Sequence, residues 1–164
     1  MNKKNVLITG ASRGIGRAIA TRLTADGYQV INFDKSAPSS LLEGEAFHCI
    51  DITDSNAVKQ LIQEIASRNE IVRLVNNAGI IKPGALEDVS ENDFDAVCAL
   101  NLKAPMVLAQ CLLPYMRKAQ FGRIVNIASR AALGKEERTA YAATKAGLQG
   151  MTRTWALELA QFGI

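Results

Sequence analysis

The chain has 164 residues, of which 48% are hydrophobic and 21% are charged, and its formal net charge is +3. This length and composition are those of a single globular domain with a substantial core. The basic residues are interspersed and form no run longer than the pair Lys3 and Lys4, so we expect no binding to nucleic acid or to a membrane surface. The first residues have neither the apolar stretch of a signal peptide nor that of a membrane span.

The cysteines and the single histidine restrict the chemistry further. Cys49, Cys98 and Cys111 are widely spaced and form no C-x-x-C pair, which favours reduced, mostly buried thiols in a cytoplasmic protein. His48 is the only histidine, so neither a histidine-based metal site nor a histidine-containing catalytic triad can be assembled. We therefore expect no bound metal.

In chain order, short apolar segments alternate with helical ones. The first helix follows a glycine turn and runs to about Asp26, with Ile15, Ile19 and Leu23 on one face. Asp54 is typical of an N-cap and predicts the start of the second helix. Five apolar segments are predicted to hold the strands: 5–9 (NVLIT), 28–33 (YQVINF), 46–51 (AFHCID), 73–79 (RLVNNAG, the strand and its exit) and 122–129 (GRIVNIAS).

A long helical region is predicted between the fourth and fifth strands. Ser90 and Asp93 have the spacing of a capping box at its start. The region runs to about Lys118 and is disturbed locally by Pro105 and Pro114.

A last helix is predicted from about Thr139. Apolar strands that alternate with helices imply an α/β fold with a parallel sheet covered on both faces and right-handed crossovers. The sequence therefore predicts a doubly wound fold.

The glycine turn TGASRGIG lies between the first strand and the first helix. Gly10, Gly14 and Gly16 allow a tight turn and let a pyrophosphate approach the helix N-terminus, where free N–H groups and the helix dipole favour anions. The spacing is G-x-x-x-G-x-G in the strand–turn–helix context that dinucleotide binding requires. A tight turn without a ligand is the alternative interpretation.

Asp34 ends the second strand, where a carboxylate accepts hydrogen bonds from the adenosine ribose hydroxyls and repels a 2′-phosphate. This favours NAD as the cofactor. Arg13 and Lys35 support NADP instead, since either side chain could meet a phosphate. A solvated turn residue is the alternative interpretation of Asp34.

Tyr141 and Lys145 stand four residues apart in YAATK, on one face of the last predicted helix. An ammonium beside a phenol stabilises the phenolate, which makes the tyrosine a usable acid or base. The spacing also arises by chance, so taken alone the pair would more often be a surface helix pair.

The motifs TGASRGIG, NNAG at 76–79, Asn101, Ser129 and YAATK occur together and in this order. Together they resemble the short-chain dehydrogenase/reductase family, most closely bacterial members of the 3-oxoacyl-carrier-protein reductase and dihydrodiol-dehydrogenase kind. The resemblance covers the whole chain. It implies a Rossmann-type sheet with strand order 3-2-1-4-5 and an NAD(P)-dependent oxidoreductase acting on a small alcohol or ketone, as a homodimer or homotetramer.

The resemblance also implies roles for individual residues. Tyr141 would be the general acid/base, and Lys145 would assist it and bind the nicotinamide ribose. Ser129 would orient the substrate oxygen, Asn101 would hold a water in a proton relay, and Asp51 would meet the adenine amino group. The implied cofactor-binding residues are Gly10, Ser12, Arg13, Gly14, Ile15, Gly16, Asp34, Asp51, Ile52, Asn77, Ala78, Gly79, Tyr141 and Lys145.

Three of these assignments have plain structural alternatives. Ser129 could be an ordinary serine at a strand exit, and Asn101 could cap a helix. Asn77, with Asn76, could satisfy backbone groups where the strand breaks off. Arg130 could contact an acidic substrate group, but a solvent-facing loop residue is the preferred interpretation.

The chain departs from the family pattern after the last predicted helix. Family members continue into a sixth and a seventh strand and a segment that covers the substrate, and none of these is encoded before Ile164. We therefore expect residues 1–164 to be a single dinucleotide-binding domain, truncated at its C-terminal end. Two functions remain open, an oxidoreductase and a catalytically silent dinucleotide-binding fragment.

Overall fold

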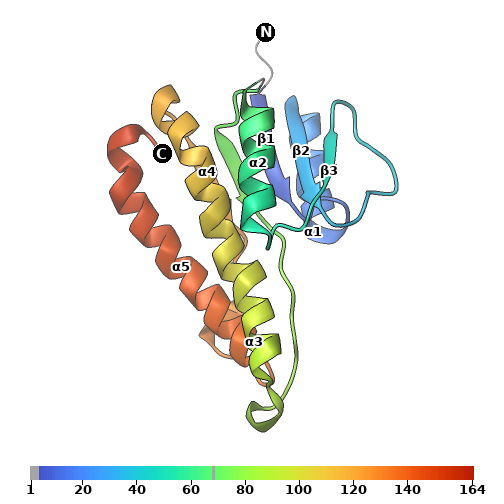
Figure 1. Ribbon diagram of the computed structural model, residues 1–164, viewed down its shortest axis with the longest axis vertical. Helices are drawn as coiled ribbons and strands as arrows, with labels where there is room; N and C mark the ends of the chain where they lie inside the picture. The colour runs from blue at the N-terminus through green and yellow to red at the C-terminus, as the bar shows by residue number, and fades with distance from the viewer. Residues whose placement is uncertain (1–3, 68) are drawn as a thin grey trace.

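A five-stranded parallel sheet organises the chain in the computed structural model, which describes residues 4–67 and 69–164 (Figure 1). The strand order is β3-β2-β1-β4-β5, which confirms the predicted doubly wound, Rossmann-type sheet. All four pairings are parallel, so the carboxyl ends of the strands meet at one edge of the sheet. The strands are β1 (Lys4–Thr9), β2 (Tyr28–Asp34), β3 (Ala46–Cys49), β4 (Arg73–Asn76) and β5 (Arg123–Asn126).

Helices cover the sheet on both faces. The elements α2, α4 and α5 lie on one face, and α1 lies on the other (Figure 1). Short 3₁₀ turns follow β4 and β5 and end the chain, at Leu86–Asp88, Arg130–Leu133 and Ala160–Phe162. The helices are α1 (Gly14–Ala25), α2 (Ser55–Ala66), α3 (Glu91–Cys98), α4 (Ala104–Ala119) and α5 (Thr139–Leu159).

The alternation of side chains along the strands produces two apolar cores. In β1, Leu7 points into the larger core beneath α2 and α4, whereas Val6 and Ile8 point into the smaller core beneath α1. In β2, Phe33 belongs to the larger core and Val30 to the smaller one. Strands buried on both faces explain why these segments are nearly continuous apolar runs.

The predicted long helical region is a continuous rod made of α3, a π-helical turn (Ala99–Lys103) and α4. The N–H of Ala104 bonds to the carbonyl of Ala99, five residues earlier. Pro105, which has no N–H to donate, is the second residue of α4, just after this wide turn. The predicted disturbance near Pro105 is therefore the π turn, while Pro114 lies inside the regular helix α4.

The rod is also apolar. Its 29 residues, Glu91–Ala119, include a window of mean hydropathy 1.6, so by length and composition alone it could cross a membrane. The side chains of Leu108, Leu112 and Met116 are fully buried in the larger core instead. The same pattern is typical of the core helix of a globular protein.

Several local predictions need correction. The third strand ends two residues earlier than predicted and the fifth strand three residues earlier. Ile15, predicted on one face of the first helix with Ile19 and Leu23, is 68% exposed, whereas Ile19 and Leu23 pack against the smaller core.

The capping box at the start of α3 is half formed. The Ser90 hydroxyl accepts a hydrogen bond from the Asp93 N–H at 3.1 Å, but the Asp93 carboxylate pairs with Lys82 at 3.1 Å. Asp54 caps α2 as predicted, accepting from the N–H groups of Asn56 and Ala57.

Shortening a core side chain in α4 should destabilise the fold far more than shortening an exposed one in α5. Leu112→Ala removes a fully buried side chain and should lower the free energy of unfolding by about 2–5 kcal/mol. Leu157→Ala, at a side chain that is 84% exposed, should change it by less than about 0.5 kcal/mol. Urea unfolding of the two variants measures the difference, and equal losses would contradict this account of the core.

Candidate functional site

The glycine turn brings α1 unusually close to the end of β1. Gly10 and Gly14 have φ values of +68° and +57°, which favour glycine. A Cβ at Gly16 would overlap the carbonyl oxygen of Gly10 and the Nδ2 of Asn77, so only glycine fits there. The turn therefore depends on glycine for two different reasons, backbone conformation and space.

The N-cap residue of α1 does not cap the helix with its side chain. Arg13 at its N-cap makes no side-chain capping bond, whereas Asp54 caps α2 and Ser90 caps α3. The first turn of a helix carries N–H groups without partners in the helix, and they favour an anion. A Cβ at Gly14 would meet nothing within 4 Å, so the space beside this turn is free for a ligand.

The exit of β4 is bonded to the glycine turn. The Thr9 hydroxyl accepts from the N–H groups of Asn77 and Ala78, both at 3.0 Å. The side-chain amide of Asn77 donates to the carbonyls of Thr9 and Gly10 at 2.9 and 3.1 Å. Asn77 therefore satisfies backbone groups, as its structural interpretation predicted, and it also fixes one wall of the site.

A cleft of about 660 Å³ opens at the carboxyl ends of the strands, where ligands bind in such sheets. Its wall includes apolar residues of the helical rod, Ala96, Ala99 and Leu100, which the sequence analysis did not single out. Their i, i+3, i+4 spacing marks one helix face but does not reveal what that face meets. Ten predicted cofactor residues line the cleft: Gly10, Arg13, Gly14, Ile15, Gly16, Asp34, Ile52, Asn77, Ala78 and Gly79.

Asp34 is held at the rim of this cleft by two backbone groups. Its carboxylate accepts from the Ser12 N–H at 3.1 Å and from the Ser36 N–H at 3.2 Å. Ser12 was predicted to bind cofactor, but it does not line the cleft and its N–H is used to orient Asp34.

Asp51 lies beyond the end of β3 and is paired with Lys35 at 2.8 Å. Desolvation raises the pKa of the Asp51 carboxyl, but hydrogen bonds from Lys35 and Thr53 outweigh it and lower the pKa below its usual value. Asp51 is exposed and does not line the cleft, although its neighbour Ile52 does.

Tyr141 and Lys145 lie on one face of α5, as their spacing predicted. The Lys145 Nζ is 5.7 Å from the centroid of the Tyr141 ring. It donates to the carbonyl of Ile127 at 2.6 Å, which ties the ammonium to the exit of β5. Lys145 is only 4% exposed, and burial lowers the pKa of its ammonium.

Asn101 lies inside the π turn and is 1% exposed. Its Oδ1 accepts from the N–H of Ile80 and its Nδ2 donates to the carbonyl of Ile80, both at 2.9 Å. The helix-cap interpretation of Asn101 is therefore wrong, because the residue sits in the middle of a continuous rod. A Cβ at Gly79 would lie 3.2 Å from the Asn101 Oδ1 and 3.7 Å from the Lys145 Nζ, so both side chains converge on the exit of β4.

Ser129 follows β5 and is half-buried. Its hydroxyl accepts from the Ala131 N–H at 3.2 Å, so it caps the short 3₁₀ turn that starts at Arg130. Within the described part of the chain, the Ser129 and Tyr141 hydroxyls make no hydrogen bond with each other. Arg130 is exposed, in keeping with a solvent-facing loop residue.

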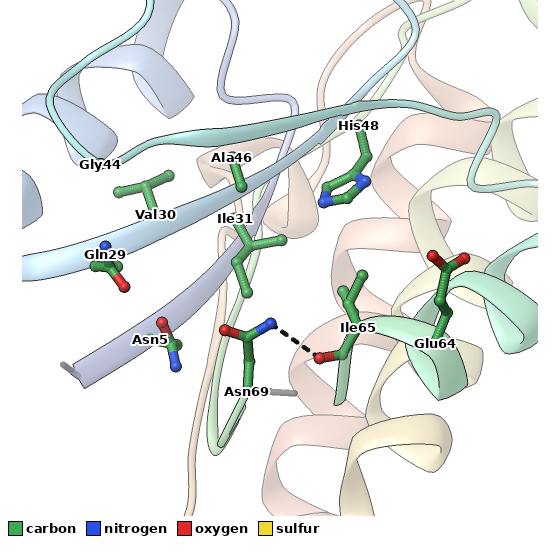
Figure 2. A pocket seen from close by; sticks show the side chains of 10 residues that line it. All are labelled: Asn5, Gln29, Val30, Ile31, Gly44, Ala46, His48, Glu64, Ile65 and Asn69. Atoms are coloured by element: carbon green, nitrogen blue, oxygen red, sulfur yellow. Dashed lines mark hydrogen bonds between the residues drawn. The ribbon is translucent and has the colours of Figure 1, made fainter. Parts of the chain in front are cut away.

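A second, smaller pocket of about 320 Å³ lies away from these residues (Figure 2). It is lined by the first residues of β1 and β2, by β3 and by the end of α2, and His48 faces it across from Glu64 and Ile65. Burial lowers the pKa of His48, and the nearby Glu64 charge opposes this shift. None of the predicted site residues lines this pocket.

Adding one methyl group at the glycine turn should disrupt the site. Gly16→Ala must push α1 away from the Gly10 carbonyl, and we expect a loss of about 2 kcal/mol or more in the free energy of unfolding. The matched control is Gly150→Ala in α5, where a Cβ meets nothing and alanine favours the helix by about 1 kcal/mol. Urea unfolding should give opposite signs for the two variants, and a neutral Gly16→Ala would refute the close approach.

The buried Lys145 should make stability depend on pH in a defined direction. The ordinary pKa of a lysine, 10.5, applies to the unfolded chain, and burial lowers the pKa of Lys145 in the folded state. Between the folded and the unfolded pKa, the unfolded chain therefore binds more protons than the folded one. The free energy of unfolding of the wild type, minus that of Lys145→Met, should therefore rise as the pH increases toward 10.5. Unfolding titrations across the alkaline range measure this difference, and a fall with pH would contradict it.

The chain is similar to a large group of known proteins. The family profile described as short chain dehydrogenase matches residues 4–164. A 3-oxoacyl-acyl-carrier-protein reductase of Thermotoga maritima is 38% identical over 168 residues, covering 96% of this chain and 68% of the relative. The corresponding reductase of Staphylococcus epidermidis is 38% identical over 173 residues, covering 98% of this chain and 71% of the relative.

Solved structures agree in fold. A gluconate 5-dehydrogenase from Burkholderia cenocepacia, in complex with NADP and tartrate, superposes with a TM-score of 0.93 at 28% identity, over 100% of this chain and 69% of its own. A 4-hydroxyisoleucine dehydrogenase complexed with NADH gives a TM-score of 0.91 at 30% identity, over 99% of this chain and 72% of its own. The sheet order, the glycine turn and these matches together show that the chain belongs to the short-chain dehydrogenase family.

Proposed function

We propose that this chain is an NAD(P)-dependent oxidoreductase that transfers a hydride between the nicotinamide of a dinucleotide and a hydroxyl/carbonyl substrate. The observation that carries the proposal is the convergence of Asn101 and Lys145 on Gly79, at the exit of β4 that also lines the cleft. The family's named relatives and structural neighbours are reductases and dehydrogenases, which supports the same reaction class.

The residues present fit a dinucleotide. The uncapped first turn of α1, with open space beside Gly14, would hold the pyrophosphate. Asp34, oriented by Ser12 and Ser36, would accept hydrogen bonds from the adenosine ribose hydroxyls. Gly79 lies close to Lys145, whose ammonium would bind the nicotinamide ribose.

NAD is the preferred cofactor. The Asp34 carboxylate would repel a 2′-phosphate, and Lys35, which could attract one, is paired with Asp51. The exposed Arg13 is the feature that favours NADP. Neighbouring structures hold NADP in one case and NADH in another, so the family accepts both.

The protein's own part in the reaction is proton transfer and orientation. The bound nicotinamide would supply or accept the hydride. Tyr141 would donate its phenolic proton to the carbonyl oxygen during reduction, and the Lys145 ammonium would stabilise the phenolate that forms. Ser129 would orient the substrate oxygen, while Asn101 would hold a water that returns a proton by way of Lys145.

Further properties follow from this assignment as proposals. The chain forms a single dinucleotide-binding domain, acts on a small alcohol or ketone in the cytoplasm, and assembles as a homodimer or homotetramer. The second candidate function is a catalytically silent dinucleotide-binding domain. It is favoured by the Ser129 hydroxyl, which is bonded within its own turn rather than to Tyr141.

Tyr141→Phe distinguishes the two functions. Removing the phenolic proton should lower turnover by about 10²–10⁴-fold while leaving the affinity for cofactor nearly unchanged. Absorbance at the reduced nicotinamide band, with NADH and NADPH compared over a panel of small ketones, measures turnover. Cofactor binding without turnover by the wild type would support the silent domain, and turnover that survives Tyr141→Phe would overturn the assigned role of this residue.

A further inference from the structure

A buried polar cluster supports the glycine turn from below. Asn32 is a polar residue in the apolar strand β2, on the face toward α1, and it is fully buried. Its Oδ1 accepts from the Ala11 N–H at 3.2 Å, and its Nδ2 donates to the Ser12 hydroxyl at 3.1 Å. Asn32 therefore fixes both residues that follow Gly10.

Glu45 gives this cluster its charge. It directly precedes β3, and its side chain has no exposed surface. Its carboxylate accepts from the Asn32 Nδ2 at 3.0 Å, from the Leu42 N–H at 2.8 Å and from the Arg17 Nη1 at 2.9 and 2.7 Å. Burying an ionised carboxylate destabilises the fold unless the group is paired and hydrogen-bonded. Each of these bonds offsets part of that desolvation cost.

Arg17 connects the cluster to the helix and to the loop. It lies one turn into α1, so its bond to Glu45 holds the first turn of the helix. Its Nη2 donates to the carbonyl of Ser40, in the connection between β2 and β3. This connection, residues 35–45, contains no helix, so the Arg17–Glu45–Asn32 cluster attaches it to the glycine turn.

We propose that Glu45 is a positioning residue of the dinucleotide site. As an acceptor, Glu45 fixes the position of the Asn32 Nδ2, so that the Asn32 Oδ1 meets the Ala11 N–H and the Nδ2 meets the Ser12 hydroxyl. Because the Ser12 N–H holds Asp34, the cluster sets the groups that meet both the pyrophosphate and the adenosine ribose. This inference rests on the proposed function and goes beyond it. Arg17, Asn32 and Glu45 do not line the cleft, so they act on it only by positioning the residues that do.

An uncharged, isosteric variant tests the proposal. Glu45→Gln keeps the volume but can present an N–H₂ group to Asn32 and loses the pairing with Arg17. We expect its affinity for ADP and for NADH to fall about tenfold, the equivalent of one charge-assisted hydrogen bond. Arg17→Lys keeps the charge but loses the second nitrogen, which donates to the carbonyl of Ser40, so its affinity should lie between those of Glu45→Gln and the wild type.

The readout separates positioning from stability. Leu112→Ala, in the core of α4, should lower the thermal midpoint without changing the affinity for either ligand. Calorimetric titration of each folded protein, below its unfolding temperature, gives the dissociation constants. If Glu45→Gln does not fold, the affinity of Arg17→Lys tests the role of the cluster. Wild-type affinity in the charge-cluster variants, or an equal loss in Leu112→Ala, would overturn the role of Glu45. A wild type that binds neither ligand would instead overturn the proposed function.

Discussion

The close approach of α1 to the end of β1 is the constraint on which the rest of the site depends. The backbone of Gly16 lies against the carbonyl of Gly10, and the Cβ of any other residue type at this position would overlap that carbonyl. The same approach places the Asn77 amide against the carbonyls of Thr9 and Gly10, which ties the exit of β4 to the turn. One backbone contact therefore sets two walls of the cleft, the helix N-terminus and the NNAG segment.

Side-chain amides then hold the parts of the site that lie far apart in the sequence. Asn77 joins β4 to β1, Asn101 joins the helical rod to the loop after β4, and Asn32 joins β2 to the glycine turn. Asn32 and Asn101 use both the oxygen and the nitrogen of the side-chain amide, and Asn77 uses its Nδ2 and its backbone N–H. Hydrogen-bonded amides of this kind specify one arrangement of the surrounding elements, which a binding site needs before its ligand arrives.

The sequence was sufficient for the elements of the fold and for most of the cleft, because these depend on local signals. Apolar runs predicted the strands, Asp54 predicted a helix start, and the spacing of Tyr141 and Lys145 placed them on one face of α5. Ten of the predicted cofactor residues do line one cleft. Here the local pattern and the tertiary arrangement agree, and the family membership of the chain explains why.

The predictions that failed concern contacts made across the sheet. Ile15 fits an apolar helix face by spacing, yet it lies in the first turn of α1 and lines the cleft instead of the core. The helix-cap interpretation of Asn101 fails because the π turn continues the helix through it. The side-chain partners of Asn32 and Glu45 lie 13 to 28 residues away in the chain. No short-range pattern encodes which buried polar group will meet which.

The π turn lets the helical rod carry an extra residue without changing the direction of the helices that flank it. A π turn holds one residue more than a regular helical turn but completes about the same rotation. Deleting one residue from Ala99–Lys103 would therefore leave Ala96 in the cleft and Leu108 in the core. Asn101, which lies inside the turn, would instead lose its alignment with both backbone groups of Ile80. The extra residue thus aims one amide at the exit of β4 while the helices on either side keep their packing.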